Sequence, residues 1–160
     1  MEIKAGMKNR ETEGEVREIR KEDLPALLRL YRELLPEDPS GDPGRLEPVW
    51  RRILSLGDFQ KTFVADAGGV LAAACTVTVI PNLTRGGRPY ALVENVITAG
   101  VFRRRGYGRQ VLDRAVEWAR RENCYKVMLL SSRERTGAHG FYRTAGFDGE
   151  GKQGFHLRLP

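Results

Sequence analysis

Hydrophobic residues recur with a helical period in the first third of the chain. Six apolar residues follow Asp23 at a spacing of three or four, which predicts a helix that Asp23 caps and Pro36 ends. These residues are Leu24, Leu27, Leu28, Tyr31, Leu34 and Leu35. Residues 36–48 hold four prolines and two glycines and predict a loop. Residues 49–56 predict a second helix, which Gly57 closes.

The period then changes to that of strands. Residues 15–20 predict a short first strand, and residues 62–66 and 70–80 predict an antiparallel hairpin that turns at Gly68 and Gly69. Residues 90–98 are apolar on both faces except at Glu94 and Asn95, which is typical of a central strand covered on each side.

The second half continues with alternating elements. An apolar stripe predicts a helix over residues 107–121, followed by a buried strand at 126–131 and a short helix at 137–145. Phe147 and residues 155–159 predict a final hairpin across residues 148–154. The order of elements predicts an α/β fold of mixed type, with one central sheet flanked by helices and a parallel strand–helix–strand unit over residues 90–131. The length of 160 residues fits a single domain over residues 1–160.

The composition narrows the class of protein. Hydrophobic residues make up 41% and charged residues 30%, as in soluble globular proteins. The longest apolar stretch, residues 70–80, is broken by Thr76 and Thr78 and is too short to span a membrane as a helix. Residues 1–15 lack an apolar signal region, so we expect a cytoplasmic protein. Cys75 and Cys124 lack the paired spacing of a zinc site, so we expect reduced thiols and no metal.

The charge distribution favours a small anionic ligand. The formal net charge of +6 suits nucleic acid, membrane or a small polyanion. The densest basic run, however, surrounds two glycines at a strand-to-helix junction and consists of Arg103, Arg104, Arg105 and Arg109. A nucleic-acid surface more often spreads its charge along a helix face among aromatic residues. We therefore expect neither a nucleic-acid nor a membrane partner.

The junction has the chemistry of a phosphate cradle. Backbone N–H groups at a helix N-terminus lack intrahelical acceptors, and the helix dipole adds positive charge, so a diphosphate fits there. Gly106 and Gly108 allow the backbone to approach the anion. A Walker A loop would need Lys-Ser/Thr where Arg109-Gln110 stands, and a dinucleotide-binding turn would need a small residue where Val111 stands. A tight turn with solvated arginines stays open as the alternative.

Two segments resemble a known enzyme superfamily. The run Arg-x-x-Gly-x-Gly after the strand resembles motif A of the GNAT N-acetyltransferases, and residues 141–147 resemble their motif B. The resemblance covers residues 60–147 and implies a GNAT-like mixed central sheet flanked by helices, with acetyl-CoA as co-substrate. It implies pantetheine held by the backbone of Val96, Ile97 and Thr98. It also implies a pyrophosphate cradle made by Arg103, Arg104, Arg105, Gly106, Tyr107, Gly108 and Arg109. Arg135 stands where many members carry a pantetheine-binding Asn, and an Arg could reach a CoA phosphate instead.

Acetyl transfer needs a neutral amine and a proton for the departing thiolate. The resemblance marks Tyr142 as the acid, and a phenol is suited to this role. Glu94 is the candidate base, because a carboxylate in an apolar strand is costly without a partner or a task; an ion pair with an arginine is its alternative role. Asn95 can mark a bulge that opens room for substrate. His139 is a second possible base or lines the cofactor site. Ser131 and Ser132 have no base to orient them, which argues against a serine nucleophile.

A shorter likeness concerns the acceptor. Residues 124–130 with Phe141-Tyr142, and Glu94-Asn95-Val96, are similar to the glucosamine-6-phosphate N-acetyltransferase branch. The resemblance predicts an N-acetyltransferase, and we expect a small-molecule amine as its acceptor. An amino sugar is a lead, which ranks below amino acids, polyamines and protein amines taken together. A non-catalytic acyl-CoA-binding sensor is the alternative, a basic nucleic-acid module is more remote, and a homodimer is possible.

Overall fold

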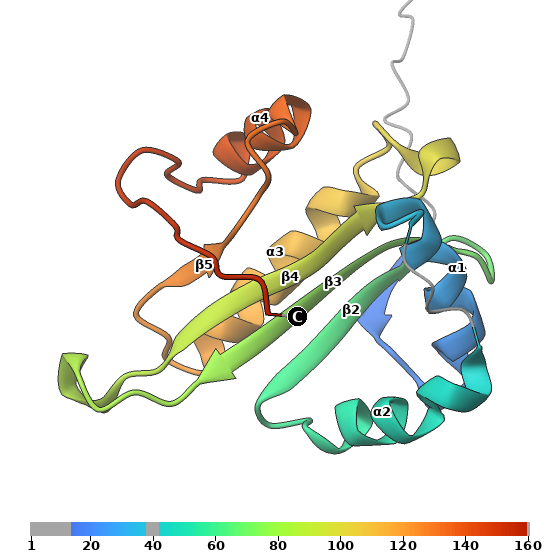
Figure 1. The fold of residues 1–160 in the computed structure, drawn as a ribbon, viewed down its shortest axis with the longest axis horizontal. Coiled ribbons are helices and arrows are strands. Elements are labelled where there is room, and N and C mark those ends of the chain that lie inside the picture. The colour runs from blue at the N-terminus through green and yellow to red at the C-terminus, as the bar shows by residue number, and fades with distance from the viewer. Residues whose placement is uncertain (1–13, 38–41, 160) are drawn as a thin grey trace, which may run out of the picture.

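One mixed five-stranded sheet runs through the molecule (Figure 1), in a computed structural model that describes residues 14–37 and 42–159. The strand order is β1-β2-β3-β4-β5. Antiparallel pairs join β1 (Glu15–Glu18), β2 (Gln60–Asp66), β3 (Leu71–Ile80) and β4 (Tyr90–Thr98). Only β5 (Val127–Leu129) runs parallel to its neighbour, β4.

The strand–helix–strand unit predicted from residues 90–131 is confirmed as parallel. Both β4 and the crossover helix α3 (Tyr107–Arg121) begin and end at the predicted residues. The predicted stripe of α3 is buried, including Val111, Leu112 and Ala115. Strand β5 is shorter than expected and only half buried, because it lies at the edge of the sheet.

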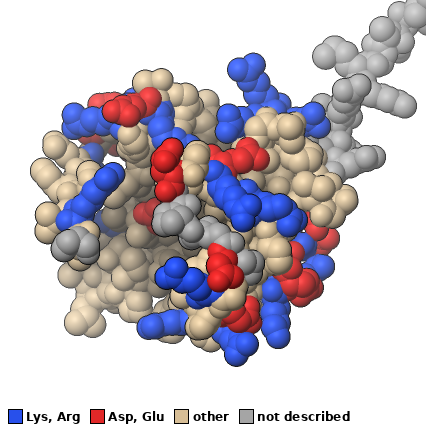
Figure 2. Space-filling view, turned by 45° about the vertical axis from the view of Figure 1, so that its right-hand side comes forward, with Lys and Arg blue, Asp and Glu red and all other residues tan. Residues whose placement is uncertain are grey.

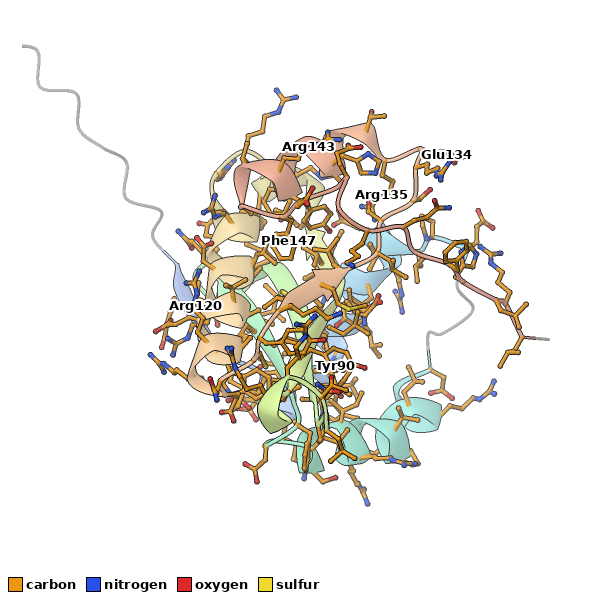
Figure 3. All side chains as sticks on the ribbon, turned by 90° about the vertical axis from the view of Figure 1, so that its left-hand side faces the viewer. Tyr90, Arg120, Glu134, Arg135, Arg143 and Phe147 are labelled. Atoms are coloured by element: carbon orange, nitrogen blue, oxygen red, sulfur yellow. The ribbon has the colours of Figure 1, made fainter. Side chains whose placement is uncertain are left out.

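Two hydrophobic clusters cover the two faces of the sheet. Helix α3 packs on one face, where its apolar stripe meets alternate residues of β2, β3 and β4. Helices α1 (Leu24–Leu34) and α2 (Pro43–Ser55) cover the other face around Trp50 and Ile97. Figure 3 shows the sheet between α3 and α2, with the last helix, α4 (Thr136–Thr144), at one end. Three short 3-10 helices complete the described elements: η1 (Lys21–Asp23), η2 (Arg85–Gly87) and η3 (Gly100–Phe102).

The predicted loop at residues 36–48 is wrong in its second half, and residues 38–41 of it lie outside the described residues. Helix α2 begins at Pro43 rather than at Val49. The Asp42 carboxylate caps it by accepting the Gly44 N–H at 2.9 Å, and a proline suits the first helical position. The exposed Pro48 is tolerated inside the helix. The prolines therefore mark the start of a helix here, and the loop predicted from their number is wrong for residues 43–48.

Asp23 does not cap α1 with its side chain, contrary to prediction. Its carboxylate accepts two hydrogen bonds from the Arg17 guanidinium, at 2.6 and 3.0 Å, and one from the Arg20 N–H. Arg17 also donates to Asp66 at 2.9 Å and is nearly buried. The contact with Arg17 lowers the pKa of Asp23 against the effect of burial, and the Gly69 N–H and Arg17 lower that of Asp66. This network ties β1 and η1 to the end of β2.

The predicted final hairpin is wrong, because residues 147–159 contain no strand. The Asp148 carboxylate accepts the N–H groups of Glu150 and Gly151, which makes a local turn, and Arg143 forms an ion pair with Glu150. These contacts hold residues 148–151 near α4 instead of in a two-stranded connection.

Two further features concern the cysteines and the length of the helices. Cys75 and Cys124 are free thiols; Cys75 is buried, and burial raises its pKa to about 12. Within residues 14–37 and 42–159, every helix is too short or too polar to span a bilayer.

Candidate acetyl-transfer site

A bulge in β4 opens the centre of the sheet. Ala74 pairs with Ile97 and Thr76 pairs with Glu94, so two residues of β4, Asn95 and Val96, stand opposite one residue of β3. Asn95 has a φ of 53°, in the left-handed region that Asn tolerates better than most residues. The bulge expected at Asn95 is therefore confirmed, and it bends β4 at this point.

Strands β4 and β5 separate at the same place. Their parallel pairing runs from Ala91 opposite Val127 to Val93 opposite Leu129 and stops there. Beyond Val93, β4 keeps β3 on one side, with Thr98 opposite Ala73, but no described strand pairs with its other side. The backbone of residues 96–98, to which the family resemblance assigns pantetheine binding, therefore has no described strand beside it on the side where β4 and β5 separate. We call this space the gap between β4 and β5. At the other side of the gap, the buried Ser131 hydroxyl has no hydrogen-bond partner among the described residues.

The N-terminus of α3 lies directly after this free edge. Gly106 precedes the helix with a φ of 87°, in the left-handed region that favours glycine. A Cβ there would meet no atom within 4 Å, so the position favours glycine for its backbone conformation and not for lack of space. Gly108 is different, because a Cβ there would lie 2.5 Å from the Thr98 hydroxyl oxygen. Glycine at position 108 thus lets the first turn of α3 pack against the end of β4. Both glycines shape a helix end whose amide groups are open to an anion.

The arginines of the basic run have separate environments. Arg103 donates to the Thr98 carbonyl at 3.3 Å, and the Arg105 guanidinium lies 5.6 Å from the centre of the Phe102 ring. Arg109 bonds Asp113 at 2.7 Å and the Thr144 carbonyl at 3.0 Å, so it connects α3 to α4. Arg104 has a left-handed φ of 60°, is exposed, and has no ion-pair partner among the described residues. Its charge is therefore the most available one at the junction.

The side chains of Tyr107 and Ile97 are buried in the two hydrophobic clusters, one on each face of the sheet. The Tyr107 ring is buried and packs edge-on against Phe102 at 5.6 Å. The Ile97 side chain is buried on the opposite face, beneath α1.

Tyr142 reaches the α3 side of the sheet from α4. Its half-buried ring packs against Phe141 and Phe147, with centroids 5.2 and 6.1 Å away. Burial raises the pKa of the Tyr142 phenol, Arg135 opposes this, and the nearby negative charge of Glu94 adds to it. The phenol is therefore protonated at neutral pH and within electrostatic range of Glu94.

Glu94 is not buried, contrary to prediction. Its side chain is exposed, and it forms no ion pair among the described residues, so the arginine-paired alternative is not supported either. Glu94 lies where the pairing of β5 with β4 has stopped, after Val93, and where the bulge at Asn95 begins, so no described strand flanks it on that side. Glu94 lies on the face of the sheet against which α1 packs. Its cross-strand partner Thr76 shows this, because the Thr76 hydroxyl forms a hydrogen bond with the hydroxyl of Tyr31 in α1.

The sequence did not reveal a row of hydroxyl groups beside Glu94. Thr76 accepts or donates a hydrogen bond with Thr62 at 2.9 Å and with Tyr31 at 3.4 Å. Burial raises the pKa of Tyr31. The signal was the pair of threonines that interrupt the apolar strand at 76 and 78, which sequence reasoning used only to exclude a membrane helix.

Arg135 and His139 lie at the start of α4. The Arg135 N–H donates to the Ser132 carbonyl at 3.1 Å, and a ring nitrogen of His139 lies 2.8 Å from the same oxygen. This contact connects α4 to the segment after β5. The His139 ring nitrogen is therefore engaged in a structural contact and does not point freely into the site as a base would. Figure 3 shows Arg135 at the α4 end of the molecule, far from Arg120.

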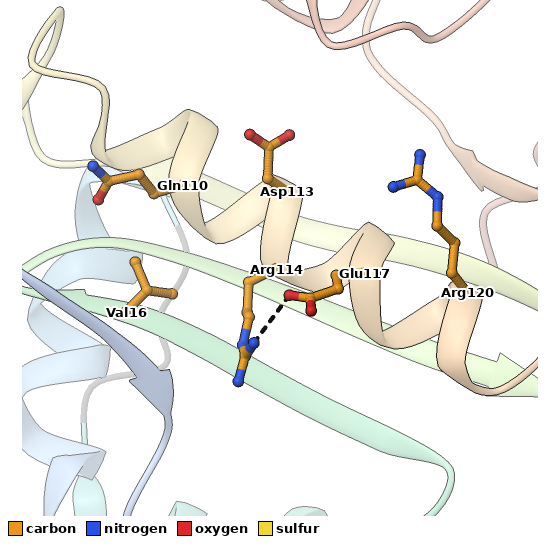
Figure 4. A pocket seen from close by; sticks show the side chains of 6 residues that line it. All are labelled: Val16, Gln110, Asp113, Arg114, Glu117 and Arg120. Carbon is orange, nitrogen blue, oxygen red and sulfur yellow. Dashed lines mark hydrogen bonds and ion pairs between the residues drawn. The ribbon is translucent and has the colours of Figure 1, made fainter.

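Two other surfaces differ from this site. An open hollow of about 430 Å³ runs along the outer side of α3 beside β1, and Figure 4 shows the Arg114–Glu117 ion pair within it. Acidic side chains lie among the basic ones on the face shown in Figure 2, so the excess of positive charge forms no continuous stripe there.

Comparisons with known proteins agree with this geometry. The pattern of the acetyltransferase (GNAT) family matches residues 24–147. A glucosamine 6-phosphate N-acetyltransferase from Oryza sativa subsp. japonica is 35% identical over 141 residues, covering 84% of this chain and 83% of that protein. A glucosamine 6-phosphate N-acetyltransferase from Trypanosoma brucei brucei is 29% identical and covers 87% and 92%. A solved putative acetyltransferase from Agrobacterium tumefaciens superimposes with a TM-score of 0.86 and 42% identity, covering 91% of this chain and 99% of that one.

Proposed function

Since the chain belongs to the acetyltransferase (GNAT) family and is an acetyl-CoA-dependent acyltransferase, we propose that it transfers the acetyl group directly to a primary amine in a ternary complex. The observation that carries this proposal is the gap between β4 and β5. It brings together a free strand edge, an open helix N-terminus, a protonated phenol and an exposed carboxylate.

The residues at the gap suit acetyl-CoA. Backbone groups of residues 96–98 would hold the pantetheine arm as an added strand does, and amides between Arg104 and Arg109 would hold the pyrophosphate. The exposed Arg104 is available to a CoA phosphate. The unpartnered Ser131 hydroxyl supports a polar ligand in the gap, since a buried hydroxyl without a partner is costly.

The two candidate catalytic groups approach the gap from opposite faces of the sheet. Glu94, on the α1 face, would accept a proton from the ammonium form of the acceptor, directly or through a water. The neutral amine would then attack the thioester carbonyl, and the carbon–sulfur bond would break as the Tyr142 hydroxyl gives its proton to the departing sulfur. The proton that the nitrogen must still lose to become an amide would go through water to the Tyr142 phenolate, which restores the phenol. A thiol ordinarily has a pKa of about 8.5 and a phenol about 10. This transfer is therefore uphill at the ordinary pKa values, and it needs a site that raises the pKa of the sulfur by excluding water from it.

A phosphorylated amino sugar is the first acceptor to test. Two relatives with this activity align over most of their length. Amino acids and polyamines are the competing acceptors.

The decisive experiment combines binding and turnover. Acetyl-CoA at 100 times its Kd should stabilise the fold by about 2.7 kcal/mol, and thiol release should then be measured with glucosamine 6-phosphate, glucosamine, spermidine and amino acids. The absence of a thermal shift at millimolar acetyl-CoA would refute the cofactor site. A clear shift without thiol release on any amine would favour the acyl-CoA sensor.

A further inference from the structure

Ser131 lies at the gap between β4 and β5 but takes no part in the proton transfers proposed above. Its hydroxyl oxygen is buried and has no hydrogen-bond partner among the described residues. Nearly all buried hydroxyl groups in proteins are hydrogen-bonded, because an unpaired one costs free energy. A hydroxyl in this state suits a polar atom of a ligand that enters the gap.

The Ser131 side chain lies on the α3 face of the sheet. Residues 127–131 alternate between partly buried and exposed, as in a strand with one covered face. Val127 and Leu129 pack against the hydrophobic cluster beneath α3, and Ser131 follows them at the same two-residue spacing. Tyr142 packs against the same cluster. The hydroxyl groups of Ser131 and Tyr142 therefore border the gap on one face of the sheet.

The register of the two strands places Ser131 beside the bulge of β4. Parallel pairing ends with Val93 opposite Leu129, and Ser131 lies two residues further along. The equivalent position on β4 is Asn95, in the bulge. In the proposed complex the pyrophosphate lies at the start of α3 and the pantetheine arm lies along residues 96–98, so the thioester comes next, at the bulge. Ser131 therefore faces the acyl end of the cofactor and not its phosphates.

Contacts with α4 hold the segment that carries Ser131. The carbonyl of the next residue, Ser132, accepts the Arg135 N–H at 3.1 Å and lies 2.8 Å from a ring nitrogen of His139. Figure 1 shows the chain leaving β5 directly toward α4. A donor that is fixed before the reaction needs no reorganisation when charge develops beside it, which favours electrostatic stabilisation of a transition state.

We propose that the Ser131 hydroxyl donates a hydrogen bond to the carbonyl oxygen of the acetyl thioester, an inference that rests on the proposed acetyl transfer. When the amine attacks, a pair of electrons moves from the carbonyl bond to this oxygen, which becomes negative and is stabilised by the donor. The electrons return as the carbon–sulfur bond breaks. Ser131 keeps its proton throughout and is neither acid nor nucleophile, so the proton transfers at Glu94 and Tyr142 are unchanged.

Ser131→Ala removes the hydroxyl and tests this contact. One oxyanion donor contributes about 10²- to 10³-fold to kcat, so kcat for thiol release from acetyl-CoA should fall at least about tenfold, measured with the most active amine of the acceptor series. The Kd of CoA, which has no acetyl group, should not change. The melting temperature of the free protein should not fall, because the substitution leaves no partner unpaired.

Two further variants control for effects on the fold. Ser132→Ala is the matched control, because its exposed hydroxyl accepts only the Glu134 N–H at 3.4 Å, and it should leave kcat unchanged. Ser131→Thr keeps a hydroxyl and should retain most of the activity that Ser131→Ala loses.

Three results would overturn the proposal. The first is an equal kcat in Ser131→Ala and the parent protein. The second is weaker binding of CoA with an unchanged kcat, which would assign the contact to the pantetheine arm. The third is a lower melting temperature with activity lost in proportion to folded protein, which would assign the hydroxyl a structural role.

The same measurements separate this inference from the proposed function. A parent protein that binds acetyl-CoA and releases thiol, with an equally active Ser131→Ala, refutes only the contact at Ser131. A parent protein that neither binds acetyl-CoA nor releases thiol refutes both.

Discussion

Replacing Tyr142 with phenylalanine isolates the proposed acid. The ring contacts with Phe141 and Phe147 are retained, and no described group hydrogen-bonds the Tyr142 hydroxyl. The free energy of unfolding should therefore change by about 0.5 kcal/mol or less, as for a substitution that leaves no buried partner behind. Any larger effect on turnover must come from the hydroxyl itself.

The expected loss of turnover follows from the role of a general acid. Such a group contributes about 10²- to 10⁴-fold, and water can replace part of it, so we expect kcat to fall roughly ten- to a thousandfold. At about 1.36 kcal/mol per factor of ten, this is a loss of about 1.4–4 kcal/mol in transition-state stabilisation. The Kd of acetyl-CoA should hardly change, because the proposed cofactor contacts are backbone groups of β4 and α3.

The assay measures steady-state thiol release as a function of pH, for Tyr142→Phe and for a matched control variant. Burial raises the pKa of Tyr142, so the phenol stays protonated until the pH is above its ordinary range, and the alkaline limb should lie above about pH 10. Tyr125→Phe removes a hydroxyl at the other end of the sheet, where its ring packs edge-on against Tyr90, and should leave kcat unchanged. An unchanged kcat in Tyr142→Phe, or a loss matched by an equal loss of folded protein, would refute the assignment.

Three further variants test other parts of the structure. Glu94→Gln should lower kcat/KM at least tenfold and remove the acidic limb of the pH profile of kcat/KM. Its melting temperature should not change, because the carboxylate is exposed and has no ion-pair partner among the described residues. A normal acidic limb would contradict the role of Glu94 as the base. Asn95→Val should destabilise the chain by roughly 1–2 kcal/mol in urea titrations, because a β-branched residue tolerates a φ of 53° poorly, whereas Asn95→Gly should not. Arg17→Met should lower the free energy of unfolding by about 3 kcal/mol at pH 7. The pKa values of Asp23 and Asp66 are lowered in the folded state, so these carboxylates stabilise the fold above about pH 4. This stabilisation is lost as the pH falls through the lowered pKa values. Arg17→Met should therefore lose less stability on acidification than the parent protein.

The sequence by itself determined the elements whose pattern is local. Strand β4 and helix α3 begin and end where the apolar period begins and ends. Their bounds could be predicted because that period depends only on residues close together in the chain. The same pattern placed the proposed cradle at the junction of β4 and α3, since glycines after a buried strand and before an amphipathic helix mark the turn between them. The bulge at Asn95 was also readable, as a polar pair inside an apolar strand.

Tertiary structure decided what depends on neighbours distant in the chain. Glu94 is exposed at the place where β5 stops pairing with β4, after Val93, and no local pattern records where a partner strand ends. Gly108 is required by the Thr98 side chain, ten residues away, and not only by an anion. Pro43 begins a helix because Asp42 caps it, and residues 155–159 have the alternation of a strand without a partner within the described chain. Periodicity specifies which face of an element is apolar, whereas only the packed structure specifies what covers that face.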